Sequence, residues 1–139
     1  MPRLSRYFIK AGLLYFVLAA MLGTLILGRS ALRLPPEIYA FTPVYYHLLM
    51  VGWVTQLIMG VAYWMFPKHS KEMPRGSEKL AWAVFIALNA GLLLRLVVEP
   101  LLMTLPALNL GGLLLLSALL QWLAGMGFII NTWTRVKER

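Results

Sequence analysis

The chain has 139 residues, of which 60% are hydrophobic and only 13% are charged. A soluble domain carries about one-quarter charged residues, so this composition excludes an ordinary soluble protein. The net charge of +8 does not indicate nucleic acid as a partner, because most Lys and Arg stand in short segments that flank long apolar runs. Cysteine is absent, which excludes disulfides, thiolate iron–sulfur sites and c-type haem.

Four apolar runs are long enough to cross a bilayer, which takes about 20 helical residues. They cover residues 10–27, 43–66, 80–98 and 107–133. The sequence therefore predicts an all-α integral membrane protein, with one domain over residues 1–139 and four transmembrane helices in an up-down bundle. The first run is too long for a signal peptide and no Ala-x-Ala-like site follows it, so we expect it to be retained.

The basic residues predict the orientation. Ten of the 13 Lys and Arg precede the first run, separate the second from the third, or follow the fourth. The positive-inside rule then places both termini and the middle loop in the cytoplasm. We expect a multi-pass protein of a bacterial cytoplasmic membrane, in contact with the lipid bilayer.

The first run and the loop after it carry packing and breaking signals. Ala19 and Gly23 stand four residues apart, a spacing of small residues that lets helices approach closely. Pro35 and Pro36, in the following loop, are expected to stop any helix.

The second run has two distinct faces when residues are placed at about 100° each around a helix. Gly52, Gln56 and Gly60 share one face, which suits close packing with sibling helices. The other face is apolar except for one histidine, and it suits a flat hydrophobic cofactor. Its members are His47, Met50, Val51, Val54, Ile58 and Val61.

The third and fourth runs carry further polar signals. Ser77 is expected to cap the third helix, which should end near the outer surface just before Pro100. Asn89 and Gln121 are expected to hydrogen-bond between helices, and Ser117 lies on a small or polar stripe of the fourth run.

His47 is the one histidine inside an apolar run. An ionisable side chain within a bilayer is costly, so by default it indicates a functional site. It lies about 7 Å into the span, in the outer leaflet. Arg95 reaches the same leaflet from the third run, where it could pair with haem propionates. His69 is too far along the chain to share a metal with His47, and we expect it to be solvated.

Plainer interpretations stay open at this point. His47 could merely hydrogen-bond a neighbouring helix, and Arg95 could simply pair with Glu99 at the i+4 position. A small multidrug-type transporter is a weaker alternative, because it needs a mid-membrane carboxylate and all five acidic residues lie in loops or near span ends.

One stretch resembles a known family. Residues 47–67, HLLMVGWVTQLIMGVAYWMFP, followed by LAW at 80–82 and NAGLLLR at 89–95, are similar to the second and third helices of the haem-copper oxidase catalytic subunit. The cbb3-type oxidase and nitric oxide reductase branch is the nearer match. The resemblance covers about residues 40–100 and consists of a histidine, glycines at +5 and +13, an aromatic pair and proline.

The resemblance implies that His47 is an axial ligand of a low-spin haem b and that the protein transfers electrons. Met50, Val51, Val54 and Arg95 would then surround the cofactor. Later helices of the family carry the other haem and copper histidines, so we do not expect this chain to reduce oxygen or nitric oxide alone.

A second axial ligand has three possible sources: His47 of a second copy in a two-fold homodimer, a methionine such as Met50 or Met103, or a partner subunit in a larger membrane complex. The rival hypothesis is a cofactor-free accessory or assembly subunit of a respiratory or photosynthetic complex, in which His47 makes only a hydrogen bond.

Overall fold

The computed structural model describes residues 1–68 and 74–136. This part of the chain is helical and contains no strand. Along the chain the elements are α1 (Arg3–Leu27), η1 (Pro36–Phe41), α2 (Thr42–His47), η2 (Leu48–Thr55), α3 (Gln56–Met65), α4 (Glu78–Thr104), η3 (Pro106–Leu108), α5 (Gly111–Thr132) and η4 (Trp133–Arg135).

Four helical stretches are long and apolar enough to cross a membrane, and they are Arg3–Leu27, Pro36–Met65, Glu78–Thr104 and Gly111–Arg135. The predicted helical class and the predicted number of apolar helices are confirmed, which makes this a multi-pass membrane protein. The second stretch is continuous although it changes its winding, because η1, α2, η2 and α3 follow one another without a break.

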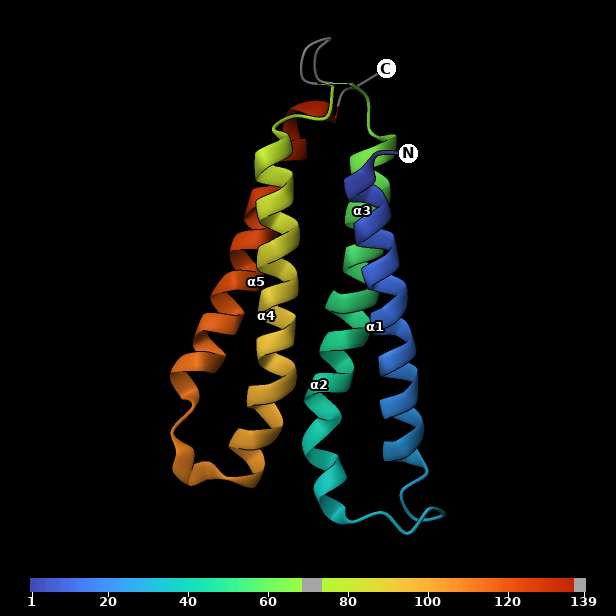
Figure 1. Cartoon of the computed structure of the whole chain (residues 1–139), viewed down its shortest axis with the longest axis vertical. Coiled ribbons are helices and arrows are strands. Elements are labelled where there is room, and N and C mark those ends of the chain that lie inside the picture. Colours follow the sequence, from blue (N-terminus) through green and yellow to red (C-terminus); the bar gives the residue numbers. More distant parts are fainter. Residues whose placement is uncertain (69–73, 137–139) are drawn as a thin grey trace.

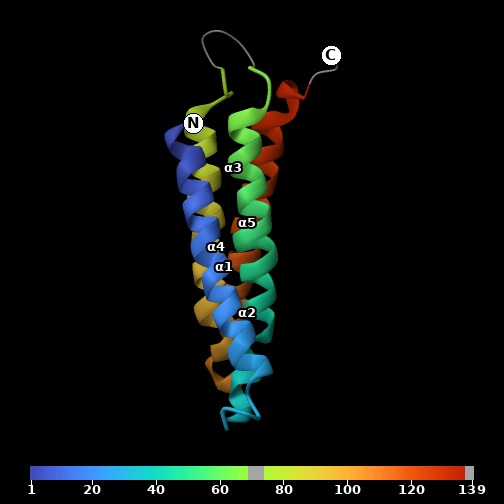
Figure 2. The same cartoon turned by 90° about the vertical axis from the view of Figure 1, so that its right-hand side faces the viewer.

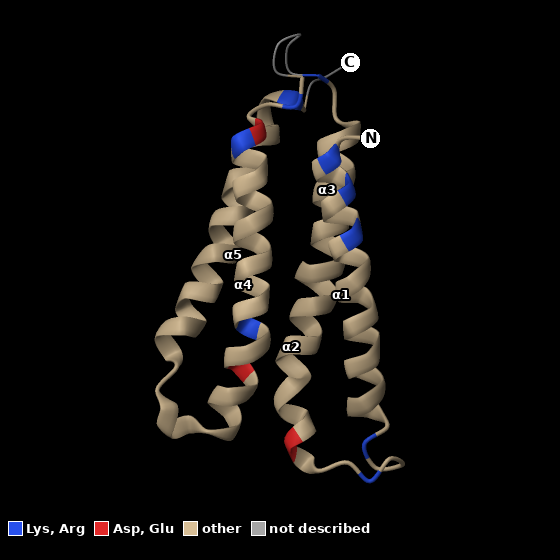
Figure 3. Cartoon of the chain, viewed as in Figure 1, with Lys and Arg blue, Asp and Glu red and all other residues tan. Residues whose placement is uncertain are grey.

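The long helices form two pairs that lie side by side (Figure 1). One pair joins α1 to the α2–α3 helix, and the other joins α4 to α5. α5 packs almost entirely on α4. Figure 2 shows the same rods turned by 90°, where they run nearly parallel along the long axis. We call the end at which α1 and α4 begin, and α3 and η4 end, the basic end. Most blue bands in Figure 3 gather there.

Three helix ends differ from the sequence prediction. α1 starts at Arg3, seven residues before the apolar run, because a basic first turn can extend outside the membrane. Pro36 begins η1 instead of preventing a helix, since proline is tolerated where no N–H donor is needed. α4 passes through Pro100 and continues to Thr104, as apolar helices allow.

The glycine face of the second helix packs on α1, as predicted. A Cβ added at Gly52 would stand 2.8 Å from Cγ of Tyr15, and one at Gly60 would stand 2.8 Å from Cβ of Phe8. These glycines therefore let the two helices approach to backbone contact distance. This close packing fixes the rotation of the second helix, and with it the direction in which His47 points.

The end of α5 holds the basic end together. Arg135 is fully buried and donates to the carbonyl oxygens of Tyr63 (3.1 Å), Phe66 (2.8 Å) and Pro67 (3.0 Å). These are free carbonyls at the C-terminal end of α3, so the guanidinium caps that helix. The sequence had indicated Arg135 only as one of the flanking positive charges.

Asn131 acts in the same region on the start of α4. Its Oδ1 accepts from the backbone N–H of Ser77 at 2.8 Å. The hydroxyl of Ser77 in turn accepts from the N–H of Leu80 at 3.3 Å, which confirms the predicted cap. One helix end thus organises the end of α3 and the start of α4.

Candidate functional site

The winding of the second helix changes immediately after His47. The residues from Leu48 to Thr55 form a π-helix, and the hydroxyl of Thr55 donates to the carbonyl of Met50 five residues earlier, at 2.8 Å. π-helical turns are rare and occur often at functional sites, because they open the backbone ladder and re-aim side chains. The sequence pattern gave no sign of this segment.

His47 has both ring nitrogens engaged. Nδ1 lies 2.9 Å from the carbonyl oxygen of Pro43, one turn earlier. Nε2 lies 2.6 Å from Nη1 of Arg95 on α4. Because a carbonyl only accepts and a guanidinium only donates, Nδ1 carries the proton and Nε2 presents its lone pair. The neighbours therefore select one tautomer of a neutral imidazole.

Arg95 also lies beside an acid. Its Nη1 is 3.6 Å from Oε1 of Glu99, one turn further along α4, and both side chains are about 14% exposed or less. Nε of Arg95 and Oε2 of Glu99 are buried without a hydrogen-bond partner among the described residues. We call His47, Arg95 and Glu99 the charged cluster. Its polar capacity exceeds what the described residues satisfy.

The structure brings together the two residues that the sequence placed at the same depth, His47 and Arg95. Both plainer contacts are also present, because His47 bonds a neighbouring helix and Arg95 pairs with Glu99. Met50 is largely exposed, whereas Val51 and Val54 are half-buried on the same helix. The contribution of Pro43 was not predicted, since it comes from a backbone atom.

A second polar cluster lies nearer the middle of the helices and is neutral. The hydroxyl of Tyr15 donates to Oδ1 of Asn89 at 2.9 Å, and Nε2 of Gln56 donates to the same oxygen at 3.3 Å. Asn89 itself donates to the carbonyl of Phe85 at 2.7 Å. We call Tyr15, Gln56 and Asn89 the neutral cluster. It joins α1, α3 and α4, as expected for Asn89.

The contact between α4 and α5 uses a hydroxyl and a carbonyl. Ser117 donates to the carbonyl oxygen of Gly91 at 2.7 Å, in a place where a side chain on Gly91 would collide with α5. Gln121 donates to Ser117 on its own helix at 3.1 Å. The expectation that Gln121 hydrogen-bonds across helices is therefore wrong for the bond observed, which stays within α5.

The fold and the charged cluster define a class: a four-helix, multi-pass membrane protein with an Arg–His–Glu group inside its apolar part. Figure 3 shows this charge as isolated blue and red bands on α4, far from the basic end. No group of three His, Asp or Glu side chains within the described ranges could hold a metal ion. His69 lies outside those ranges. Comparison of the chain with family models, curated proteins and solved structures finds no match in any of the three.

Proposed function

We propose that the chain is a haem b-binding, electron-transfer subunit of a bacterial cytoplasmic membrane, with His47 as an axial ligand and both termini in the cytoplasm. The observation that supports this most is the tautomer of His47. A ligating histidine usually donates its other N–H to a carbonyl or carboxylate, which orients the ring and raises its basicity. Pro43 provides that carbonyl here, so Nε2 is the atom that would face a metal.

The surrounding residues fit the same role. Bound haem supplies a reversible one-electron couple at its iron. Arg95 would leave Nε2 of His47 and form a charge-assisted pair with a propionate. Its buried Nε has no partner among the described residues that this movement would break. Met50, Val51 and Val54 continue the apolar face beyond His47. Val51 packs against the hydrophobic core, which fixes the position of this face of the second helix.

The second axial ligand is proposed to be His47 of a two-fold-related copy. Within the described residues His47 is the only histidine, and a two-fold interface supplies the same residue twice. Met50 and Met103 are largely exposed, so they remain the intramolecular or partner-side alternatives. Cross-linking or mass measurement of the haem-loaded protein would distinguish a dimer with one haem per two chains from a loaded monomer.

The test is a reduced-minus-oxidised absorbance spectrum of protein purified after expression with ample haem. We expect a sharp b-type α band in the native chain and its loss in His47→Ala. Asn89→Leu, which changes the neutral cluster only, is the matched control and should keep the band. A featureless spectrum in the native chain would reject the proposal, as would an unchanged spectrum in His47→Ala.

One observation favours a second candidate, a cofactor-free accessory or assembly subunit of a respiratory or photosynthetic complex. Nε2 of His47 already accepts a 2.6 Å bond from Arg95, and this contact joins two helices without any cofactor. Under this alternative His47→Gln retains an acceptor and keeps the protein stable and assembled. Under the haem proposal the same variant loses the α band.

A further inference from the structure

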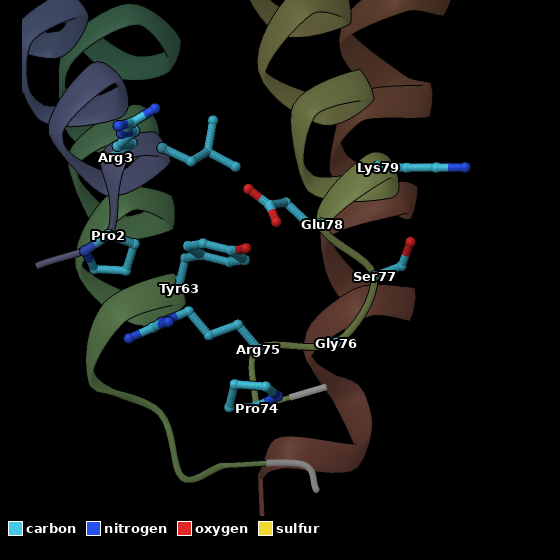
Figure 4. Close-up of a pocket in the computed structure, with 10 residues that line it drawn as sticks. Pro2, Arg3, Tyr63, Pro74, Arg75, Gly76, Ser77, Glu78 and Lys79 are labelled. Atoms are coloured by element: carbon cyan, nitrogen blue, oxygen red, sulfur yellow. The ribbon is translucent and has the colours of Figure 1, made fainter. Parts of the chain in front are cut away.

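A cavity of about 510 Å³ lies at the basic end, between the pair that contains α1 and α3 and the start of α4 (Figure 4). Arg3 lines it from α1, Tyr63 from α3, and Arg75 and Glu78 from the segment that leads into α4. The cavity thus joins three parts of the chain that are distant in sequence. The charged cluster is on the other half of the molecule, so this is a separate site.

The cavity presents charges of both signs that do not neutralise one another. In Figure 4 Glu78 turns its carboxylate toward Tyr63, and the Arg75 side chain runs beneath the same ring. Within the described residues, none of Arg3, Arg75 and Glu78 makes an ion pair or a side-chain hydrogen bond. Lys79 turns away from the cavity in Figure 4. Among the described residues, two guanidinium groups and one carboxylate thus have no partner that a ligand would have to displace.

The wall that carries Tyr63 is rigid. Tyr63 is only 5% exposed, and its carbonyl accepts from the fully buried Arg135. The Arg135 guanidinium also lies over the Tyr63 ring, 5.8 Å from its centroid. The hydroxyl of Tyr63 is directed toward the Glu78 side of the cavity. A ligand would thus find a fixed aromatic wall between the cationic and the anionic groups.

The depth of the cavity matches the headgroup region of a bilayer. The apolar stretch that contains α3 ends at Met65, and the next stretch begins at Glu78 itself. Basic pockets between transmembrane helices at this level bind lipid phosphates, and aromatic residues such as Tyr63 gather there. A purely anionic headgroup, however, would meet the carboxylate of Glu78.

We infer that this cavity binds a zwitterionic aminoalkyl phosphate, namely the phosphoethanolamine headgroup of a membrane lipid. Its phosphodiester accepts from Arg75 and its ammonium donates to Glu78, while Arg3, on the other side of the Tyr63 ring in Figure 4, adds positive charge to the cavity. The guanidinium fork of Arg75 suits the phosphate oxygens, and the compact ammonium suits a carboxylate that pairs with no cation among the described residues. This inference does not depend on haem, because no residue of the cavity belongs to the charged cluster.

Native mass spectrometry of the full chain in mild detergent tests the inference. The protein is mixed with equal amounts of phosphatidylethanolamine, phosphatidylglycerol and phosphatidylcholine of the same acyl chains. We expect phosphatidylethanolamine to be retained about five-fold better than phosphatidylglycerol, which lacks the cation and so differs by the effect of one charge near a membrane surface. It should also be retained better than phosphatidylcholine, whose quaternary ammonium has no N–H to donate to Glu78. Equal retention of all three lipids would overturn the inference.

Two variants of cavity residues, Glu78 and Arg75, show whether the cavity is responsible. Glu78→Gln should reverse the preference, with phosphatidylethanolamine about five-fold weaker and phosphatidylglycerol stronger. Arg75→Gln should weaken both lipids about five-fold. Arg33→Gln, which removes one positive charge at the opposite end, is the control and should change neither. If Arg33→Gln acted like Arg75→Gln, or Glu78→Gln did not alter the preference, the inference would fail.

A competition arm separates the lipid from a soluble ligand of the same chemistry. Free phosphoethanolamine at millimolar concentration is added to the lipid-loaded protein. Retention of the lipid supports a membrane headgroup, since the acyl chains add apolar contacts with the helices. Complete displacement, together with binding of phosphoethanolamine alone, would overturn the lipid assignment and make the ligand a soluble aminophosphate.

Discussion

The charged cluster and the neutral cluster both lie inside the apolar part of the molecule, yet they differ in how well their atoms are satisfied. In the neutral cluster Asn89 uses one oxygen for two donors and its amide for a backbone carbonyl. In the charged cluster Arg95 and Glu99 each keep a buried atom without a partner in the described residues. The neutral cluster leaves one amide oxygen, Oε1 of Gln56, without a partner among the described residues, whereas the charged cluster leaves one atom on each of two ionisable groups. Because an unpartnered charged group is costlier to bury than an amide, the charged cluster has the greater capacity for a ligand or partner.

The largest loss of stability should appear when the cation of the charged cluster, Arg95, is removed. Arg95→Leu leaves a carboxylate that is 13% exposed without its cation, and it leaves His47 Nε2 without a donor. We expect the free energy of unfolding to fall by about 3 kcal/mol, because an uncompensated buried charge is costly. Equilibrium unfolding in mixed micelles measures this loss.

The double variant Arg95→Leu with Glu99→Gln is the control for charge. Neutralising the acid should recover at least half of the lost stability, since the carboxylate then no longer needs a cation. Equal stability of the single and double variants would show that the Arg95–Glu99 pair, 3.6 Å apart, contributes through shape alone.

A smaller loss is expected in the neutral cluster. Asn89→Leu removes the acceptor of Tyr15 and Gln56 at nearly constant volume, and it should cost about 1 kcal/mol, as interhelical hydrogen bonds in membranes do. The same unfolding assay applies. A loss as large as that of Arg95→Leu would remove the distinction between the clusters.

We expect a still smaller loss of stability at the contact between α4 and α5. Ser117→Ala deletes one bond to the Gly91 carbonyl, and we expect a cost of about 0.6 kcal/mol. Ser30→Ala, at an exposed turn position, should not alter unfolding measurably. If both serine variants behaved alike, the hydroxyl–carbonyl bond would carry no net stability.

The smallest effect is expected at Gln56, where the neutral cluster itself is imperfect. Gln56 is fully buried, donates one bond of 3.3 Å, and has no partner for Oε1 within the described residues. Gln56→Met keeps the length of the side chain and removes that oxygen, so stability should change by no more than about 0.5 kcal/mol in either direction. A loss above 1 kcal/mol would indicate that a water molecule or another group satisfies Oε1.

Much of the fold follows from the sequence, because apolar runs and glycine spacing act along a single helix. The four apolar helices, the close packing of Gly52 and Gly60 on a neighbouring helix, and the cap at Ser77 were all predicted, whereas the identity of that neighbour, α1, was not. The start of α1 at Arg3 and the end of α4 at Thr104 were not predicted. A charged first turn can be helical or not, and a helix can end before Pro100 or continue through it.

The site was predictable only in part. His47 and Arg95 were placed at one depth by counting residues from opposite ends of two antiparallel helices, and the structure puts their nitrogens 2.6 Å apart. The π-helical segment, the Pro43 carbonyl and the burial of Arg135 have no local signal. They depend on how distant helices meet, which residue spacing alone does not determine.

The cap that Arg135 places on α3 has a consequence for the order of assembly. Arg135 is the last residue of the fourth apolar stretch, yet it supplies the bonds that complete the end of the second. We therefore expect the last turn of α3 to lack these three bonds until the end of the fourth stretch has docked against it.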